Sequence, residues 1–207
     1  GGRVTLVSSF AALGMGLVIG VQLGILAGLH SQTAFDTILM RIIDVLMAFP
    51  FMVFAMVVAA LWGPGLTQLL VAVVAVWWVP FARISRSVVL QIKNDPSVLA
   101  ARVLGASEPR IVFCELLPKT IGSVAVLATF ELGTLILSIS ALSFLGLGAQ
   151  PPLPEWGSML SDARAHFFQH PHLLFGPALF VVVTVLALNF IGEGLRDVMD
   201  PYEGVRL

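Results

Sequence analysis

Five long apolar stretches, separated by shorter polar ones, dominate the chain. The hydrocarbon core of a bilayer, about 30 Å thick, is crossed by about 20 mostly apolar helical residues. The stretches that come close to this length are Val4–Leu29, Ile42–Trp62, Leu66–Ala82, Thr120–Leu147 and Leu173–Ile191. They predict five transmembrane helices, and therefore an all-α polytopic membrane protein.

The polar segments between these stretches differ in length and chemistry. Gly63-Pro64-Gly65 is a short turn between the second and third spans. The segment 83–119 is much longer, and its first part is expected to extend the third span as a polar helix to about Gln91. The segment 148–171 is a proline-rich loop, and the tail 192–207 is polar.

The basic residues indicate which side of the membrane each segment faces. Segment 83–119 contains six of the eleven Lys and Arg residues, and basic loops favour the cytoplasm. With this segment inside, nine basic residues lie inside, and only Arg3 and Arg164 lie outside. The pattern therefore predicts an external Gly1 and a cytoplasmic C-terminus, with Arg196 and Arg206 on the inner side.

Composition excludes the other broad classes of protein. Hydrophobic residues make up 58% of the chain and charged residues 11%, with a mean hydropathy of +0.99. A soluble domain carries about 25% charged residues, and a disordered chain needs low hydrophobicity. The net charge of −1 gives no indication of nucleic-acid binding, and the single Cys114 excludes an internal disulfide. We expect one membrane domain over residues 1–207.

The beginning of the chain has no recognisable targeting segment. The first residue is Gly1 rather than a methionine, and Gly1–Arg3 has none of the features of a signal peptide. Because the predicted topology places Gly1 outside, we expect a further N-terminal span to precede it.

Small residues recur at every fourth position of the first span. They form one face almost without side chains, made of Ser8, Ala12, Gly16, Gly20, Gly24 and Gly28. Such faces allow helices to approach closely within a bilayer. The stripe predicts tight packing, either inside this chain or against another subunit.

The long polar segment has helix signals of its own. Asp95-Pro96 predicts a helix start, Gly105 a corner, and Ser107-Glu108-Pro109 a second start that runs to about Leu116. Pro118 then precedes the fourth span. An apolar stripe is expected to be exposed on the first helix, where it would meet a protein partner or the lipid headgroups. Its members are Val98, Leu99, Val103 and Leu104.

Motifs along nearly the whole chain resemble the permease subunits of ABC importers. The segment Ala100-Ala101-x-x-x-Gly105, followed by Leu117-Pro118, is similar to the cytoplasmic loop signature of that family, with Leu99 and Glu115 departing from it. Further motifs are similar to the C-type permease of the peptide and nickel branch. They are Arg41-Ile42-Ile43-Asp44, Ala48-Phe49-Pro50, Phe81-Ala82-Arg83 with Arg86, Leu142–Gly148, Pro151-Pro152, Pro154–Gly157, Met159-Leu160, Gly194–Asp197 and Asp200-Pro201.

The resemblance implies a type I importer transmembrane domain whose loop 95–118 couples it to a separate ATPase. The residues that it assigns to coupling are Val98, Leu99, Ala100, Ala101, Arg102, Gly105, Ala106, Leu117 and Pro118. The sequence has no G-x-x-x-x-G-K-[ST] loop, so ATP and magnesium are expected on the partner ATPase, with no cofactor or metal on this chain.

The same resemblance implies the partners and the location. It implies a second permease chain, two ATPase subunits and an extracytoplasmic binding protein, in the cytoplasmic (inner) membrane of a bacterium or archaeon. The cargo would be short peptides, nickel or related metal chelates. Two other classes stay open: a carrier driven by an ion gradient, and an assembly factor that does not transport.

Two acidic residues lie within the predicted spans. Glu131 is about 16 Å into the fourth span, where an acid faces protein or water rather than lipid. It is interpreted as a carboxylate bonded to Ser, Thr or Asn of another span, or as the proton site of a gradient-driven carrier. Asp44 lies three residues after Arg41, and this spacing predicts a local ion pair.

The outside loop contains three histidines, His166, His170 and His172. Their spacing could offer imidazoles to a transition metal, but Pro171 interrupts any helix that would align them, so we expect an exposed polar loop. The enzyme motifs H-E-x-x-H and G-x-S-x-G are missing from the sequence, which predicts a transport subunit rather than an enzyme.

Overall fold

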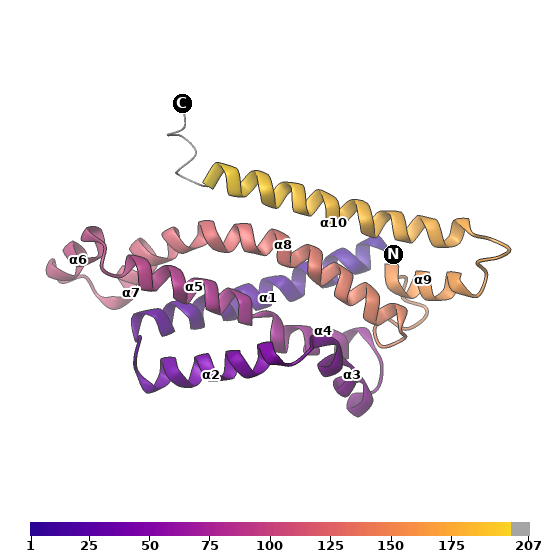
Figure 1. The fold of residues 1–207 in the computed structure, drawn as a ribbon, viewed down its shortest axis with the longest axis horizontal. Coiled ribbons are helices and arrows are strands. Elements are labelled where there is room, and N and C mark those ends of the chain that lie inside the picture. The colour runs from indigo at the N-terminus through magenta and orange to yellow at the C-terminus, as the bar shows by residue number, and fades with distance from the viewer. Residues whose placement is uncertain (200–207) are drawn as a thin grey trace. The chain divides into compact units, whose positions relative to one another are not determined.

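The computed structural model describes residues 1–199, and helices account for all regular structure in that range (Figure 1). The predicted all-α fold class is therefore confirmed. The helices are α1 Gly2–Leu29, α2 Ala34–Ala48, α3 Phe51–Trp62, α4 Leu66–Trp77, α5 Val79–Ile92, α6 Pro96–Val103, α7 Glu108–Ile111, the π-helical turn η1 Val112–Leu116, α8 Leu117–Phe144, α9 Trp156–Arg164 and α10 His172–Met199.

Four helical segments are long and apolar enough to cross a membrane. They are Gly2–Leu29, Leu66–Ile92, Glu108–Phe144 and His172–Met199, and the pair α2 and α3 makes a fifth if it is counted as one broken span. The predicted third span thus continues through α5 to Ile92, close to the expected Gln91. The fifth continues past Ile191 to Met199, into the segment that was expected to be a polar tail.

The second predicted span, 42–62, is not one straight helix. Helix α2 already starts at Ala34 and ends at Ala48, and α3 restarts at Phe51. Pro50 explains the break, because a proline has no backbone N–H and restricts the residue before it. The early start of α2 has a local signal that the apolar pattern missed: the amide of Asp36 donates to Thr33 Oγ1 at 3.4 Å, as in a helix N-cap.

The polar segment after α5 agrees with the predicted signals at three points. Helix α6 begins at Pro96 after Asp95, Gly105 forms a corner with φ of +79°, and α7 begins at Glu108 after Ser107. The end of the segment differs from the expectation. Pro118 does not separate it from the fourth span, because α7, η1 and α8 follow one another without a break.

Two compact units make up the fold. The first contains Gly1–Met15, Phe49–Trp77 and Thr129–Gly192. Within it, α3 and α4 form a hairpin in which the rings of Phe51 and Trp77 meet edge to face, with centroids 5.0 Å apart. The fully buried residues Leu135, Ile136 and Leu142 of α8 belong to its core.

The second unit contains Gly16–Ala48, Trp78–Ala128 and the described residues from Glu193 onward. Helix α2 packs on α5, and an apolar cluster joins them to α1. Its buried members are Ala27, Leu39, Ile43, Val79 and Ala82. The segment 93–119 belongs to this unit, and its buried residue Val98 packs with Ile25 of α1 and Val89 of α5. One permease domain over 1–207, with spans at 4–29, 42–62, 66–82, 120–147 and 173–191, stays a prediction.

Candidate functional site

Helix α6 is fixed to the second unit by one side of its surface. Val98 is fully buried, so the prediction that it belongs to an exposed stripe is wrong. The reason is that Val98 packs into an apolar cluster with Ile25 of α1 and Val89 of α5. The cluster also contains Ile111 and Leu116, with Val21, Leu29, Ile92, Ala101, Ala106, Val112 and Leu117 packed against it.

The other side of α6 is open. Leu99, Val103 and Leu104 are 45%, 87% and 85% exposed. Ala100 and Arg102 are also exposed, and Ala101 is half-buried. Because the adjacent side chains of Val103 and Leu104 are both largely exposed, the end of α6 has an apolar surface that a partner can cover.

The corner at Gly105 has the hydrogen bonds of a Schellman motif. The amide of Ala106 donates to the carbonyl of Ala101, and that of Gly105 to the carbonyl of Arg102, each at 3.0 Å. A Cβ at Gly105 would meet no atom within 4 Å, but φ of +79° is a conformation that side chains disfavour. The glycine is therefore needed for the turn itself rather than for space.

An ion pair brings the start of α6 to the start of α8. The ammonium of Lys119 donates to Asp95 Oδ2 at 3.1 Å and to Ser97 Oγ at 2.9 Å. Leu117 is half-buried and Pro118 is exposed next to it. The structure thus brings the two halves of the predicted loop signature, Ala100 to Gly105 and Leu117-Pro118, into one small region.

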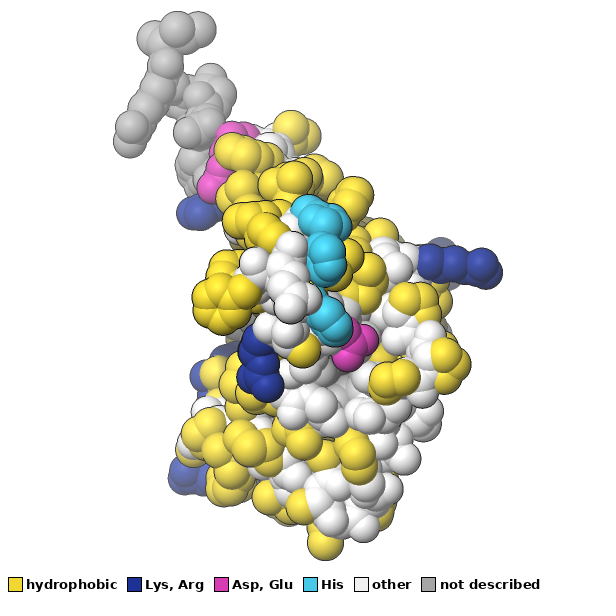
Figure 2. Space-filling view, turned by 90° about the vertical axis from the view of Figure 1, so that its right-hand side faces the viewer, with side chains coloured by type: hydrophobic (Ala, Val, Ile, Leu, Met, Phe, Trp, Pro, Cys, Tyr) yellow, Lys and Arg dark blue, Asp and Glu magenta, His cyan; other side chains and the backbone are white. Residues whose placement is uncertain are grey.

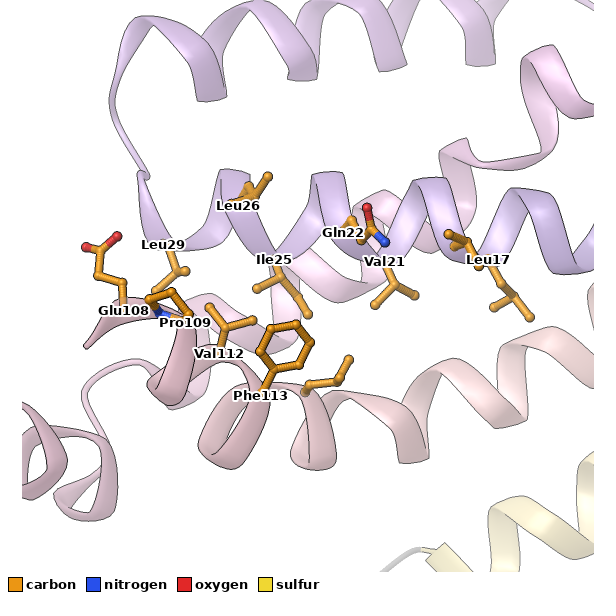
Figure 3. Close-up of a pocket in the computed structure, with 12 residues that line it drawn as sticks. Leu17, Val21, Gln22, Ile25, Leu26, Leu29, Glu108, Pro109, Val112 and Phe113 are labelled. Carbon is orange, nitrogen blue, oxygen red and sulfur yellow. The ribbon is translucent and has the colours of Figure 1, made fainter. Parts of the chain in front are cut away.

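An apolar groove of about 680 Å³ lies between α1 and the α7–η1–α8 segment (Figure 3). Leu17, Val21 and Ile25 line it from α1, and Val112 and Phe113 from η1. Phe113 is 67% exposed. Both walls belong to segments that are long and apolar enough to cross a membrane, so the groove offers its surface to lipid or to another helix.

The glycine stripe of α1 packs against α5 inside this chain. A Cβ on Gly20 would clash with the carbonyl oxygen of Trp78, and one on Gly24 with that of Ala82. A Cβ on Gly28 would lie 2.7 Å from Val89 Cβ. Gly16 is buried as well, as are Ser8 and Ala12. The backbone of α1 therefore comes as close to α5 as the absence of side chains allows.

The partner predicted for Asp44 is wrong. Asp44 Oδ1 accepts a hydrogen bond of 2.8 Å from Arg83 of α5 rather than pairing with Arg41 of its own helix. This pair forms because α2 packs along α5, which the sequence spacing cannot show. Both side chains are about half exposed.

Glu131 is half-buried on α8, and its carboxylate lies near the indole of Trp77 in the first unit. This neighbour was not among the Ser, Thr and Asn partners that the sequence suggested. The choice between a structural carboxylate and a proton site stays a prediction.

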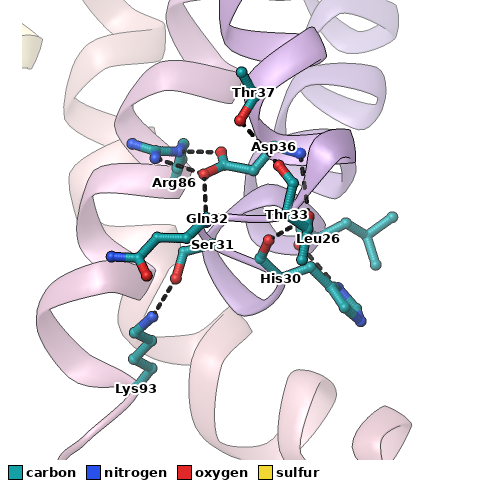
Figure 4. A network of polar contacts seen from close by, with 9 residues as sticks. All are labelled: Leu26, His30, Ser31, Gln32, Thr33, Asp36, Thr37, Arg86 and Lys93. Carbon is teal, nitrogen blue, oxygen red and sulfur yellow. Dashed lines mark hydrogen bonds and ion pairs between the residues drawn. The ribbon is translucent and has the colours of Figure 1, made fainter.

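A second ion pair between α2 and α5 was not predicted from the sequence. Arg86 Nε and Nη2 donate to Asp36 Oδ1 and Oδ2 at 2.6 and 2.8 Å (Figure 4). The Asp36 side chain is 5% exposed, and that of Arg86 26%. The spacing Thr33-x-x-Asp36 is the one local signal that could have drawn attention to this acid.

Glu155 is the anchor of the loop 148–171 in the first unit. It is fully buried, and its Oε1 accepts from Thr5 Oγ1 at 3.0 Å and Ser140 Oγ at 3.1 Å. Its Oε2 accepts from the amides of Gly157 and Ser158, at 2.7 and 3.1 Å, and so caps α9. Helix α9 was not predicted, although Glu155-x-x-Ser158 is a reciprocal capping pair.

The histidines of the segment 148–172 lie on the surface, where Figure 2 shows histidine side chains side by side. The rings of His170 and His172 meet at 5.7 Å between centroids. Among residues 1–199, no group of three or more His, Cys, Asp or Glu side chains is arranged to hold a metal ion.

Comparison with known proteins agrees with the loop signature. Residues 20–202 match the family model described as binding-protein-dependent transport system inner membrane component. The chain is 43% identical over 202 residues to the glutathione transport system permease protein GsiD of Pectobacterium atrosepticum, covering 97% of this chain and 66% of that protein. To GsiD of Salmonella typhimurium it is 47% identical over 167 residues, covering 80% of this chain and 55% of that protein. The chain therefore spans less than two-thirds of these relatives.

The fold also has solved counterparts. Two inward-facing crystal forms of the MetNI methionine ABC transporter contain a chain that superposes with TM-scores of 0.70 and 0.71, at 20% and 21% identity. In each case the match covers 95% of this chain and 93% of the other. The type I importer architecture implied by the motifs is confirmed at the level of the fold.

Asp200-Pro201, which carried part of the resemblance, and Arg206, which was counted among the inside basic residues, lie outside the described residues, and the other motifs lie within them. The family match covers most of the chain, and the relatives are similar over most of its length. This chain belongs to the family of binding-protein-dependent transport system inner membrane components.

Proposed function

We propose that this chain is the permease subunit of an ATP-driven importer and that α6 is the segment that docks onto the ATPase. The observation that carries the proposal is the two-sided burial of α6. Val98 is fully buried against α1 and α5, while Val103 and Leu104 are more than four-fifths exposed. A partner that moves α6 would therefore act directly on two membrane helices.

The remaining parts of the machine are on other chains in this proposal. A second permease chain completes the pathway, two ATPase subunits bind ATP and magnesium, and a binding protein delivers cargo on the external side. The membrane is the cytoplasmic (inner) one, with the C-terminus inside. Support comes from the family description and from the permease names of the relatives.

The proposed cargo is a short peptide. The relatives are named as permeases of glutathione, which is a tripeptide. Nickel or a metal chelate is the second candidate from the branch resemblance, and no further observation supports it. A gradient-driven carrier with Glu131 as its proton site would not explain why α6 is anchored by one side and open on the other.

The test is a pull-down of the full-length tagged protein in mild detergent, with co-purifying proteins identified by mass. An ATPase and a second permease in fixed ratio to this chain are expected. Val103→Asp and Leu104→Asp should each weaken ATPase association about 30-fold. A charge placed in a docked apolar contact should cost as much binding free energy as truncation of a strong interface residue.

The matched control is Val198→Asp on α10, where the wild-type side chain is 85% exposed, as Leu104 is. It should leave the ATPase bound. A homo-oligomer without any ATPase, under conditions that keep a known importer intact, would overturn the proposed function. Equal loss with Val198→Asp would overturn the assignment of α6.

A further inference from the structure

The turn between α1 and α2 is bound to α5 through a partly buried polar network centred on the buried carboxylate of Asp36 (Figure 4). Both carboxylate oxygens of Asp36 accept hydrogen bonds from the guanidinium of Arg86, and Oδ2 also accepts one from the backbone amide of Gln32 at 3.1 Å. A bidentate pair fixes both the distance and the angle between two groups, which a single contact does not. Burial makes loss of one partner costly, since it leaves a charge without compensation.

Two further features show that this turn is held in one conformation. Gln32 has φ of +66°, a left-handed conformation uncommon for a residue other than glycine, and its amide is the one that Asp36 accepts. Lys93, which follows α5, donates to Ser31 Oγ at 2.5 Å. The turn is therefore attached near the middle of α5 and again just beyond its end.

Helix α5 is followed almost directly by α6, the proposed docking helix. Helix α5 ends at Ile92, and α6 begins at Pro96. Val89 of α5, Val98 of α6 and Ile25 of α1 are buried in one cluster. The glycines of α1 bring its backbone against α5 along the same stretch. Motion of α6 is thereby passed to α5, and the network around Asp36 connects α5 to the start of α2.

We propose that Asp36 and Arg86 are positioning residues of the ATP-coupling step, and that their ion pair makes α2 and the α1–α2 turn move as one body with α5 and α6. This proposal rests on the proposed function of α6. The contrast with the pair Asp44 and Arg83 supports the assignment. That pair joins the same two helices, but through a single hydrogen bond between side chains that are 53% and 47% exposed.

The first experiment measures whether α2 and α6 move together. Spin labels are placed at Ile38 of α2, which is exposed, and at Asn94 just before α6, in the full importer with Cys114→Ser. In the otherwise unchanged protein, the label distance should keep one narrow distribution without nucleotide and with ATP. In Asp36→Asn/Arg86→Gln, the distribution should broaden or shift between the two states. Asp44→Asn/Arg83→Gln is the matched control and should behave like the unchanged protein.

The second experiment measures coupling in vesicles that contain both permeases, the ATPases and the binding protein. The readout is tritiated glutathione taken up per ATP hydrolysed. Asp36→Asn/Arg86→Gln should lower this ratio about 2- to 30-fold, the range for residues that carry coupling between distant sites, without reducing ATP hydrolysis equally. Arg86→Lys keeps the charge and loses the bidentate geometry, so its ratio should be intermediate.

A covalent replacement separates positioning from a role of the charges themselves. In Asp36→Cys/Arg86→Cys with Cys114→Ser, a bifunctional thiol reagent should restore the uptake ratio that the uncross-linked variant has lost. If the ratio stays low after cross-linking, or if the neutral variant keeps both the narrow label distribution and the wild-type ratio, the proposal is overturned.

Failures of the two proposals can be told apart. An unchanged importer that binds no ATPase contradicts the proposed function, whatever the variants do. If it binds ATPase but takes up no glutathione, only the cargo is contradicted, and the label distances still decide the role of the pair. Loss of ATPase binding in Arg86→Lys and in the cross-linked variant alike would assign the pair to folding alone and overturn the positioning role.

Discussion

The two long segments between spans are anchored by different kinds of contact. The segment 93–119 is held mainly by apolar packing around Val98, with one ion pair at Lys119. The loop 148–171 is held by Glu155, a fully buried carboxylate that accepts four hydrogen bonds from Thr5, Ser140, Gly157 and Ser158.

The difference shows how rigidity and adaptability are distributed in this protein. Hydrogen bonds to a buried carboxylate are directional, so the loop at Glu155 has a single favourable geometry. Apolar packing is not directional and tolerates small shifts. The packing of α6 on α5 can therefore absorb small shifts while the two helices still move together, and the contact between α9 and α8 at Glu155 cannot shift in the same way. Four predictions test this contrast.

The largest effect is expected at Glu155. Glu155→Ala would leave buried donors without an acceptor, at about 1–3 kcal/mol for each unsatisfied group, so we expect a loss of at least about 4 kcal/mol in the free energy of unfolding. The measurement is a denaturation titration in mixed micelles, together with protease cleavage within 148–171. Asp162→Ala, on the exposed part of α9, is the control. A small effect at both positions would mean that the polar network does not hold the loop.

The next effect is expected at the α1–α5 contact that supports the segment 93–119. Gly24→Ala places a methyl group against the carbonyl of Ala82, and a helix backbone cannot yield as a side chain can. We expect a loss of about 3 kcal/mol from this overpacking.

Gly14→Ala, in the same helix, is the matched control, since a Cβ there meets nothing within 4 Å. It should raise stability by up to about 1 kcal/mol through helix propensity. The same titration compares both variants. Equal behaviour of the two would contradict the close approach of α1 and α5. The protease resistance of the loop 148–171 should stay normal in Gly24→Ala and in Gly14→Ala, because neither variant changes the contacts of Glu155.

A smaller effect is expected at Val98. Val98→Ala removes two methyl groups from the cluster and leaves a cavity, at about 2 kcal/mol. Because the contact is apolar, we expect α6 to be loosened rather than displaced, with faster cleavage at Arg102 by trypsin and weaker ATPase binding. Val103→Ala, at an 87% exposed position, should change neither stability nor cleavage. Unchanged cleavage in Val98→Ala would show that α6 is held by something other than this cluster.

The smallest effect is expected at Lys119. Its pair with Asp95 is about 40% exposed on both sides, and exposed pairs contribute less than about 1 kcal/mol. Lys119→Met should therefore lower stability only slightly, and less at high salt, where the pair is already screened. A loss as large as that of Val98→Ala would mean that the charge, not the apolar cluster, holds the segment.

Local signals predicted much of the segment 93–119 and little of the loop 148–171. The starts at Pro96 and Glu108 and the corner at Gly105 depend on a few neighbouring residues, so they can be read directly. Pro50 was visible as an interruption of the apolar run 42–62, but the run was still predicted to be one span because α2 and α3 together are apolar enough to cross a membrane.

The candidate site was predictable in outline but not in its contacts. The resemblance to the permease loop signature pointed to Ala101 and Leu117, and the structure packs both against the cluster that contains Val98. The burial of Val98 was missed, because the periodicity of a short helix shows two apolar sides without telling which one meets the core. Asp36, Arg86 and Glu155 were missed as anchors, because their partners are distant in the sequence.

The sequence alone determined that this is a helical membrane protein and to which kind of transport subunit its motifs are similar, and it predicted which segments are apolar enough to span the membrane. These properties depend on composition and on short spacings, which a chain has before it folds. Only the tertiary structure decided that Asp44 pairs with Arg83, that Val98 faces inward, that the glycines of α1 meet α5, and that Glu155, at the start of α9, bonds to Thr5 of α1. The physical reason is that each of these contacts joins helices far apart in the chain, and which helices meet is the result of packing all of them together.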